Sequence, residues 1–170
     1  YCFDAVLLWK NLDAIGTNNP AGEYYLTDIV EILNRSGHKV APMTIADPTE
    51  LNGINTKVEL AEADAILRAR KTRALMLSGV TIERPETVVI DVDVQVGQDT
   101  TLEPFTRLVG RTSIGEDCVI GSSSVISNST LGDGVLVGSF TSIADAKIGA
   151  GAHVGPFARL RMNNEVSENV

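Results

Sequence analysis

The segment "TSIGEDCVIGSSSVI", residues 112–126, decides the fold of the C-terminal half of this chain. Its aliphatic residues Ile114, Ile120 and Ile126 are six positions apart. This spacing fits neither the period of two of a half-buried strand nor the period of about 3.6 of an amphipathic helix. The same spacing continues in both directions, with two shorter steps, to Leu131 and to Ile148. The aliphatic positions are Ile90, Val96, Leu102, Leu108, Ile114, Ile120, Ile126, Leu131, Val137, Ile143, Ile148, Val154, Leu160 and Val166.

Small or β-branched residues mostly stand four positions after each aliphatic, and Gly often follows the aliphatic directly. The first set is Val94, Thr100, Thr106, Thr112, Cys118, Ser124, Thr130, Val135, Thr141, Ala152 and Ala158, with Lys147 and Asn164 as exceptions. We attribute the glycines to corners, where a residue with wide φ/ψ freedom is useful. The pattern predicts an all-β parallel β-helix over residues 81–170, in which three hexapeptide sides close one coil and each coil buries its neighbour's core.

Composition excludes several classes of partner. The chain has 170 residues, 44% of them hydrophobic, and a net charge of -8, so we expect no nucleic-acid partner and no anionic membrane partner. No apolar run is long enough for a membrane span, so we expect no membrane insertion. Cys2 and Cys118 have no metal or redox spacing, which favours a reducing, cytoplasmic location. The chain begins at Tyr1 rather than Met, which suggests a piece of a longer protein.

Residues 1–80 have a different, α/β pattern. The N-terminal "YCFDAVLLWKNL" indicates the end of a strand followed by a short helix, "DIVEILNRSG" a helix closed by Gly37, and "HKVAPMTIA" a strand. Thr56 and Glu59 form a capping-box pattern that predicts a helix over about 57–78, with Leu60, Leu67 and Ala74 on one face. Gly79 and Pro85 end it.

Four segments resemble one family. They are "GEYYLTDIV" (22–30), "NGINTKVEL" (52–60), "LSGVTI" (77–82) and "VGPFARLR" (154–161), in this order and followed by hexapeptides. They are similar to the bifunctional N-acetylglucosamine-1-phosphate uridyltransferase/glucosamine-1-phosphate acetyltransferase family, GlmU. The resemblance implies that residues 1–80 are the C-terminal part of a Rossmann-like nucleotidyltransferase domain plus a linking helix. It also implies that residues 81–170 are the first coils of a left-handed β-helix that trimerises and acetylates.

The resemblance assigns three residues to the uridyl-transfer site. Asn55 matches an asparagine that binds Mg²⁺, a cation that accepts neutral amide oxygens. Tyr25 and Thr27 match positions that line the amino-sugar pocket. Without the motif, Asn55 is more simply explained as a turn residue beside Gly53, and Tyr25 and Thr27 as core and cap residues.

Arg161 is the one site residue expected in the β-helix. In the family, the second Arg of "FARLR" binds the phosphate of the amino-sugar phosphate, a task suited to a planar fork of donors. A surface salt bridge is the alternative for a lone Arg. The family usually continues with Pro-Gly, whereas this chain has Met162 and Asn163, which puts the local turn in doubt. Asn163 could still adopt a left-handed conformation.

The resemblance implies acetyl-CoA, UTP and Mg²⁺ as donor, co-substrate and cofactor, sugar phosphates as substrates, and a homotrimer. The catalytic residues of both reactions would lie before Tyr1 and after Val170, so none is expected within this chain. His38 and His153 have no partner at motif spacing, which argues against a three-histidine zinc enzyme. Two alternatives remain: another sugar-1-phosphate nucleotidyltransferase with a β-helix tail, and a non-catalytic trimerising scaffold.

Overall fold

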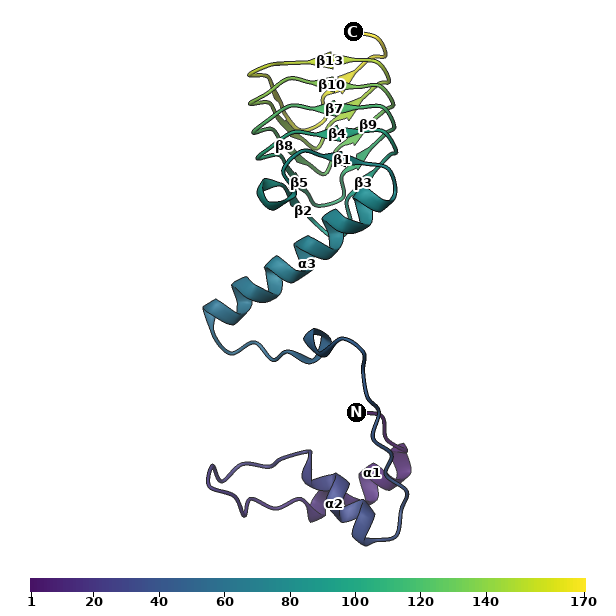
Figure 1. The fold of residues 1–170 in the computed structure, drawn as a ribbon, viewed down its shortest axis with the longest axis vertical. Helices are drawn as coiled ribbons and strands as arrows, with labels where there is room; N and C mark the ends of the chain where they lie inside the picture. Colours follow the sequence, from purple (N-terminus) through teal and green to yellow (C-terminus); the bar gives the residue numbers. More distant parts are fainter. The chain divides into compact units, whose positions relative to one another are not determined.

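The six-residue spacing forms three parallel β-sheets of five strands each in the computed structural model, which describes residues 1–170. Successive strands belong to successive sheets, so that three strands make one coil and the coils stack on each other (Figure 1). The predicted parallel β-helix is therefore confirmed. Its strands are β1 (Thr81–Ile82), β2 (Val89–Ile90), β3 (Gln95–Val96), β4 (Thr101–Leu102), β5 (Arg107–Val109), β6 (Ser113–Ile114), β7 (Val119–Ile120), β8 (Val125–Ser127), β9 (Thr130–Leu131), β10 (Leu136–Val137), β11 (Ser142–Ala144), β12 (Lys147–Ile148), β13 (His153–Val154), β14 (Arg159–Leu160) and β15 (Glu165–Val166).

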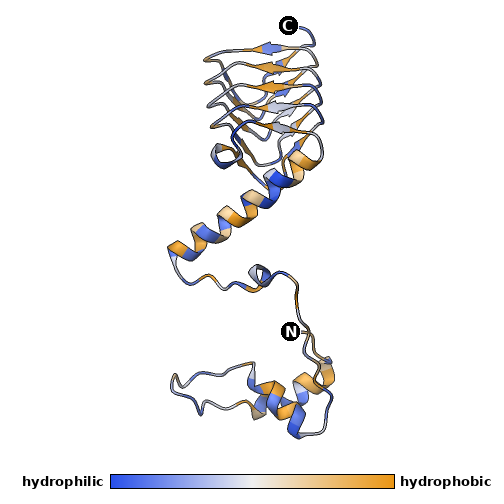
Figure 2. Ribbon diagram, viewed as in Figure 1, coloured by the Kyte–Doolittle hydropathy of each residue, from blue (hydrophilic) through white to orange (hydrophobic).

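The aliphatic residues of the pattern stack inside the β-helix. Ile90 pairs with Leu108, Leu108 with Ile126, and Ile126 with Ile143, each in register in the sheet β14-β11-β8-β5-β2. All four side chains are buried, because alternate residues of a strand point to opposite faces. Figure 2 shows hydrophobic residues along the strands of the coils. Each coil thus contributes one layer to a continuous apolar core.

The two five-residue steps lie at the same corner of adjacent coils. They join β8 to β9 and β11 to β12, and β11 pairs with β8 while β12 pairs with β9. At these corners Ser129 and Ala146 are the buried small residues, whereas Thr130 is exposed. Thr130 fits the four-position spacing but is not buried, because the missing residue moves the inward position one residue earlier in the chain. The same displacement explains why Lys147 was an exception.

The glycines after the inward aliphatics serve close packing. A Cβ on Gly97 would lie 2.5 Å from the carbonyl carbon of Gly115, and a Cβ on Gly121 would lie 2.5 Å from the backbone nitrogen of Ser139. Of the glycines in this set, only Gly155 has a positive φ. Elsewhere the positive φ falls two residues later, for example at Asp117 (54°). Our attribution of these glycines to backbone freedom was therefore wrong outside Gly155.

Helix α3 (Lys57–Leu77) packs against the first coil, and Figure 1 shows it at the end of the stack opposite the C-terminus. The capping box is formed: Thr56 Oγ1 accepts from the Glu59 N–H at 3.1 Å, and Glu59 Oε2 accepts from the Thr56 N–H at 2.7 Å. Leu60 and Leu67 are exposed, and the buried helix residues are Thr72 and Leu75, close to the C-terminal end. The buried residues of the helix therefore lie in its C-terminal half, next to the first coil. The short helix η3 (Pro85–Thr87) follows β1.

Residues 1–51 form a separate compact unit without strands, and residues 52–170 form the other. The first unit contains α1 (Ala5–Asn11), η1 (Leu12–Ala14), α2 (Asp28–Arg35) and η2 (Pro48–Leu51). Ile15, Ile29 and Leu33 form its small core. The two predicted helices and the Gly37 cap, with φ +78°, are present.

The strands predicted before α1 and in residues 38–46 are not formed. A strand needs a neighbour to satisfy its backbone groups, and the first unit supplies none. The Rossmann-like assignment of this segment therefore stays a prediction. None of the helices in residues 1–170 combines the length and hydrophobicity needed to cross a bilayer.

Candidate functional site

Arg161 follows β14 at a corner of the last complete coil. Leu160 points toward the core, so the side chains of Arg159 and Arg161 on either side of it point outward. Arg161 is exposed, and its guanidinium has no hydrogen-bond or ion-pair partner within the chain. The surface salt bridge that was the alternative for this residue is therefore not formed. A free planar fork of N–H donors is available to an anion at this corner.

The turn after Arg161 is well ordered by hydrogen bonds in spite of the Met162–Asn163 sequence. Asn163 has φ +64°, the left-handed conformation that we considered possible for it. Its N–H donates to the carbonyl oxygen of Asp145, the positive-φ residue at the same corner of the preceding coil, at 2.9 Å. Asn163 therefore takes up the conformation that a glycine would otherwise supply.

Asn55 lies directly before the cap of α3. Its backbone N–H donates to Glu59 Oε2 at 2.6 Å, and its exposed side chain makes no hydrogen bond within the chain. The N–H groups of Asn55 and Thr56 lower the pKa of the Glu59 carboxyl below its ordinary value, because they stabilise the charged form. A small hollow of about 230 Å³ lies beside this helix start, lined by Asn52, Gly53, Ile54, Glu59, Glu62, Ala63 and Ile66.

The residues around Asn55 do not form a complete magnesium site. Residues 1–170 contain no group of three or more His, Cys, Asp or Glu side chains that could hold a metal ion. The nearby Glu59 carboxylate is already bonded to backbone N–H groups. Mg²⁺ prefers six oxygen ligands, of which Asn55 offers one neutral amide oxygen.

Tyr25 and Thr27 lie at the start of α2 in the unit 1–51, whereas Asn55 and Arg161 belong to the unit 52–170. Both residues are exposed. Thr27 has helical φ and ψ angles of -58° and -28°, and its side chain makes no capping hydrogen bond. Thr27 is the N-cap residue of α2, which begins at Asp28 as expected, although its hydroxyl does not cap, and the core explanation for Tyr25 is wrong because its side chain is exposed. Neither hydroxyl is used by the fold.

The histidines and cysteines form no cluster. His153 points outward from β13, and His38 is half-buried in the loop after α2. Cys118 is buried, where desolvation raises the pKa of its thiol, and Cys2 is exposed. None of these four residues has the surroundings of an activated nucleophile or a metal ligand.

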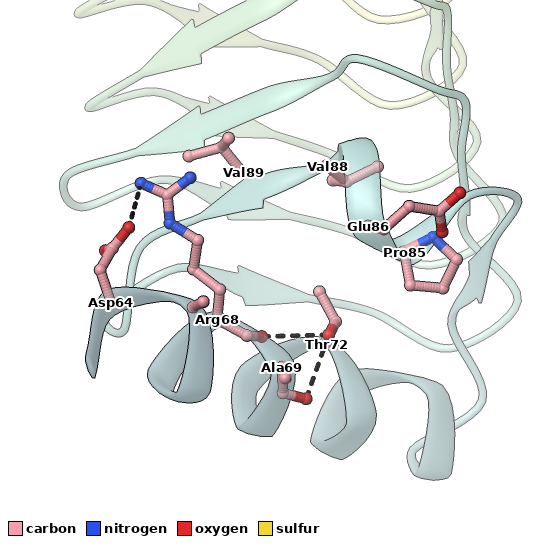
Figure 3. Close-up of a pocket in the computed structure, with 9 residues that line it drawn as sticks. Asp64, Arg68, Ala69, Thr72, Pro85, Glu86, Val88 and Val89 are labelled. Atoms are coloured by element: carbon pink, nitrogen blue, oxygen red, sulfur yellow. Dashed lines mark hydrogen bonds and ion pairs between the residues drawn. The ribbon is translucent and has the colours of Figure 1, made fainter. Parts of the chain in front are cut away.

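Two open grooves flank α3 where it meets the first coil, and sequence reasoning did not find them. Along the groove of about 500 Å³ in Figure 3, Asp64 and Arg68 of α3 form an ion pair, and Thr72 donates to the backbone of its own helix. In the second groove, of about 520 Å³, Lys71 Nζ donates to the carbonyl oxygens of Val92 and Val94 at 2.9 and 2.7 Å. Lys71 thus joins the helix to the coil, whereas the Asp64–Arg68 and Thr72 contacts lie within α3. None of the predicted site residues lies in either groove.

Exposed phenylalanines form a ridge along another corner of the β-helix, interrupted by Ser123 between Phe105 and Phe140. Phe105, Phe140 and Phe157 all have positive φ, and the rings of Phe140 and Phe157 stack with centroids 5.3 Å apart. The six-residue pattern did not reveal this ridge, because its members stand outside the inward-facing positions.

Three comparisons with known proteins agree with this architecture. The family description "Bacterial transferase hexapeptide (six repeats)" matches residues 93–128. The acetyltransferase domain of PglB from Neisseria gonorrhoeae, solved with acetyl coenzyme A, superimposes with a TM-score of 0.51 over 62% of this chain and 53% of that chain. Its sequence is only 13% identical, so this likeness concerns the fold alone.

Curated sequences are much more similar. The bifunctional protein GlmU of Solibacter usitatus is 58% identical over 166 residues, which cover 98% of this chain and 36% of that protein. The GlmU of Koribacter versatilis is 50% identical over 129 residues, or 76% of this chain and 28% of that protein. The chain thus spans about a third of the length of the curated relatives that it matches.

Proposed function

Because this chain belongs to the GlmU family along the segment that it spans, we propose that its protein makes UDP-N-acetylglucosamine in two steps. An acetyl group passes from acetyl-CoA to the amine of glucosamine-1-phosphate. The product then attacks the α-phosphate of UTP, and pyrophosphate leaves. The observation that carries the proposal is the 58% identity over 98% of the chain, which includes all four family segments.

Arg161 binds the phosphate of glucosamine-1-phosphate in the acetyl-transfer step. Its guanidinium is exposed and unpaired at a corner of the β-helix, so it need not break a bond within the protein to bind an anion. Paired, charge-assisted N–H···O bonds would attract the phosphate and orient the sugar amine. Arg161 does not move a proton, and we assign no general base within residues 1–170.

The N-terminal residues serve uridyl transfer. Tyr25 offers an aromatic face and Thr27 a hydroxyl to the amino sugar, and both are exposed. Asn55 would offer one neutral amide oxygen to Mg²⁺, an ion that would neutralise the charge of the UTP phosphates. Because Asn55 is the only Mg²⁺ ligand that we assign, we derive no reaction step that involves the ion.

The architecture and setting follow the same family assignment. Residues 1–80 are the end of a Rossmann-like nucleotidyltransferase domain with its linking helix, and residues 81–170 begin a left-handed β-helix. The protein is a cytoplasmic homotrimer that assembles through this β-helix. The cytoplasmic setting is supported by the two free cysteines.

The test is acetyl transfer by the full-length enzyme with Arg161→Ala. We expect kcat/KM for glucosamine-1-phosphate to fall by an amount equivalent to about 2 to 4 kcal/mol, with uridyl transfer close to normal. Arg161→Lys recovers part of the loss, because an ammonium lacks the two-pronged geometry. Arg107→Ala is the control, since Arg107 is an exposed arginine of β5, which belongs to the same sheet as β14, the strand that ends directly before Arg161. Unchanged acetyl-transfer kinetics in Arg161→Ala would refute the phosphate role.

A further inference from the structure

The side chain of Asn164 closes the turn that begins at Arg161. The backbone N–H of Arg161 donates to Asn164 Oδ1 at 2.7 Å, and the backbone N–H of Asn164 donates to the carbonyl oxygen of Arg161 at 3.1 Å. We propose that Asn164 is a positioning residue, which fixes the backbone of Arg161 so that the guanidinium meets the substrate phosphate. This inference rests on the phosphate role proposed above for Arg161.

The turn lacks the residues that usually make it rigid. A hydrogen bond from its fourth to its first residue and a positive φ at its third residue are features of a type II turn. Such turns favour Pro at the second position, which fixes φ, and Gly at the third, which has no steric penalty there. This chain has Met162 and Asn163 at these positions. The additional bond from the Asn164 side chain supplies a restraint that the turn sequence does not.

The residues at the position of Asn164 in earlier coils make a different contact. Thr112 and Ser129 are buried there, and their hydroxyls donate to turn carbonyl oxygens, of Val109 and Ser127 respectively, both at 2.7 Å, whereas Asn164 is exposed. Ala146 has no polar group to offer. At Asn164 the direction is reversed, because the side chain accepts from the N–H of the residue that directly follows the strand.

The turn is also anchored to the coil beneath it. Asn163 N–H donates to the carbonyl oxygen of Asp145 at 2.9 Å, and Lys147 N–H donates to the carbonyl oxygen of Asn164 at 3.0 Å. With Asn164 Oδ1 on the Arg161 N–H as well, the backbone is held at both ends of the turn. The backbone of Arg161 is therefore restrained, whereas its side chain can still change conformation.

Fixing the backbone should matter for substrate binding rather than for chemistry. The torsions of Arg161 set the direction of its Cα–Cβ bond, and a fixed direction reduces the ordering cost when the phosphate is bound. Loss of one hydrogen bond to a neutral acceptor should weaken binding by about three- to tenfold. Since Asn164 touches no reacting atom, the maximal rate should change little.

The experiment is steady-state acetyl transfer by the full-length enzyme with Asn164→Ala. We expect KM for glucosamine-1-phosphate to rise about three- to tenfold, with kcat and KM for acetyl-CoA nearly unchanged. Adding Met162→Pro and Asn163→Gly should restore KM, because these residues preset the same turn. Met162 N–H makes no hydrogen bond, so proline removes none.

The control is Asn128→Gly. Asn128 Oδ1 accepts from the Arg111 N–H at 3.1 Å, so this variant also removes a bond from an arginine N–H to an asparagine side chain at this corner, here between adjacent coils and near an arginine without an assigned role. Glycine suits the positive φ of 46° at this position. We expect unchanged KM values for Asn128→Gly.

The outcomes separate this inference from the proposed function. If Arg161→Ala impairs acetyl transfer while Asn164→Ala leaves KM unchanged, the positioning role is overturned and the function stands. If Asn164→Ala lowers kcat and raises both KM values, and the Pro-Gly pair does not rescue it, Asn164 is merely structural and the inference fails. If Arg161→Ala has no effect, the proposed function itself fails at this residue.

Discussion

The backbone N–H of Asn55 donates a hydrogen bond to the carboxylate of Glu59 at 2.6 Å. The residue expected to bind Mg²⁺ is therefore held through its backbone by the first turn of α3, while its side chain stays exposed. The same carboxylate accepts the Thr56 N–H, so Glu59 holds the backbone of both the capping residue Thr56 and the candidate ligand Asn55. Changes at Asn55, Thr56 and Glu59 should consequently have separable effects on activity and on helix stability.

Asn55→Ala removes the amide oxygen but leaves the backbone bond to Glu59 in place. In the full-length enzyme we expect uridyl transfer to fall by about ten- to a hundredfold, the range typical of residues that tune a metal site. Acetyl transfer should be unaffected. The control is Asn52→Ala, which changes an exposed neighbour. Equal loss of both activities would mean that Asn55 supports the fold and is no ligand.

Thr56→Ala removes the hydroxyl that accepts the Glu59 N–H at 3.1 Å. We expect a loss of about 1 kcal/mol in the free energy of unfolding, the usual effect of losing a cap. Urea denaturation followed by circular dichroism measures it. Thr130→Ala serves as the control, because Thr130 is exposed and its hydroxyl makes no hydrogen bond. The cap would be unimportant if both variants were equally stable.

Acidification should loosen the start of α3. The Asn55 and Thr56 N–H groups lower the pKa of Glu59 below its ordinary value of 4.5. Since the pKa is lower in the folded chain, the stabilisation is complete above the unfolded value and is lost as the pH falls through the lowered pKa. We expect the amide NMR signals of Asn55 and Thr56 to shift with a midpoint below 4.5. Glu59→Gln should abolish this titration, and a midpoint at or above the ordinary value would contradict the prediction.

Gly121→Ala should destabilise the β-helix. The new Cβ would lie 2.5 Å from the backbone nitrogen of Ser139, and the backbone of a stacked coil cannot move without disturbing its neighbours. We expect a loss of about 1 to 3 kcal/mol, as for overpacked cores. Gly53→Ala is the matched control, because its nearest neighbour would be a side-chain atom at 3.9 Å. Similar denaturation midpoints for the two variants would show that coils tolerate the added methyl group.

The two cysteines should differ in reactivity. Cys118 is buried, its Sγ donates to the carbonyl oxygen of Gly132 at 3.2 Å, and burial raises the pKa of the thiol. A thiol reagent at mildly alkaline pH should therefore react quickly with one group, the exposed Cys2, and with Cys118 only after denaturation. Cys2→Ser should eliminate the fast reaction. A fast reaction that persists in Cys2→Ser would show that the coil around Cys118 opens readily.

The candidate site was predictable only where a local motif marked it. The "FARLR" segment pointed to Arg161, and the capping box placed Asn55 before a helix, because both signals lie within a few residues of the chain. Asn164 gave no such signal, since an asparagine four residues beyond the inward Leu160 was merely an exception to the pattern. Its role depends on the direction of one side chain in a folded turn. Lys71 likewise bonds to carbonyl oxygens more than twenty residues away.

The sequence by itself determined the β-helix. Aliphatic residues recur about every six positions from Ile90 to Val154, and each one packs on the equivalent residue of the neighbouring coil. The sequence also determined the start of α3, where Thr56 and Glu59 satisfy each other's backbone. Only the tertiary structure decided that Ser129 rather than Thr130 is buried, that Gly121 is needed for close packing, and that residues 38–46 are not a strand. These features depend on which segment lies alongside, and burial, steric room and backbone hydrogen bonding are properties of that pairing, not of the residue alone.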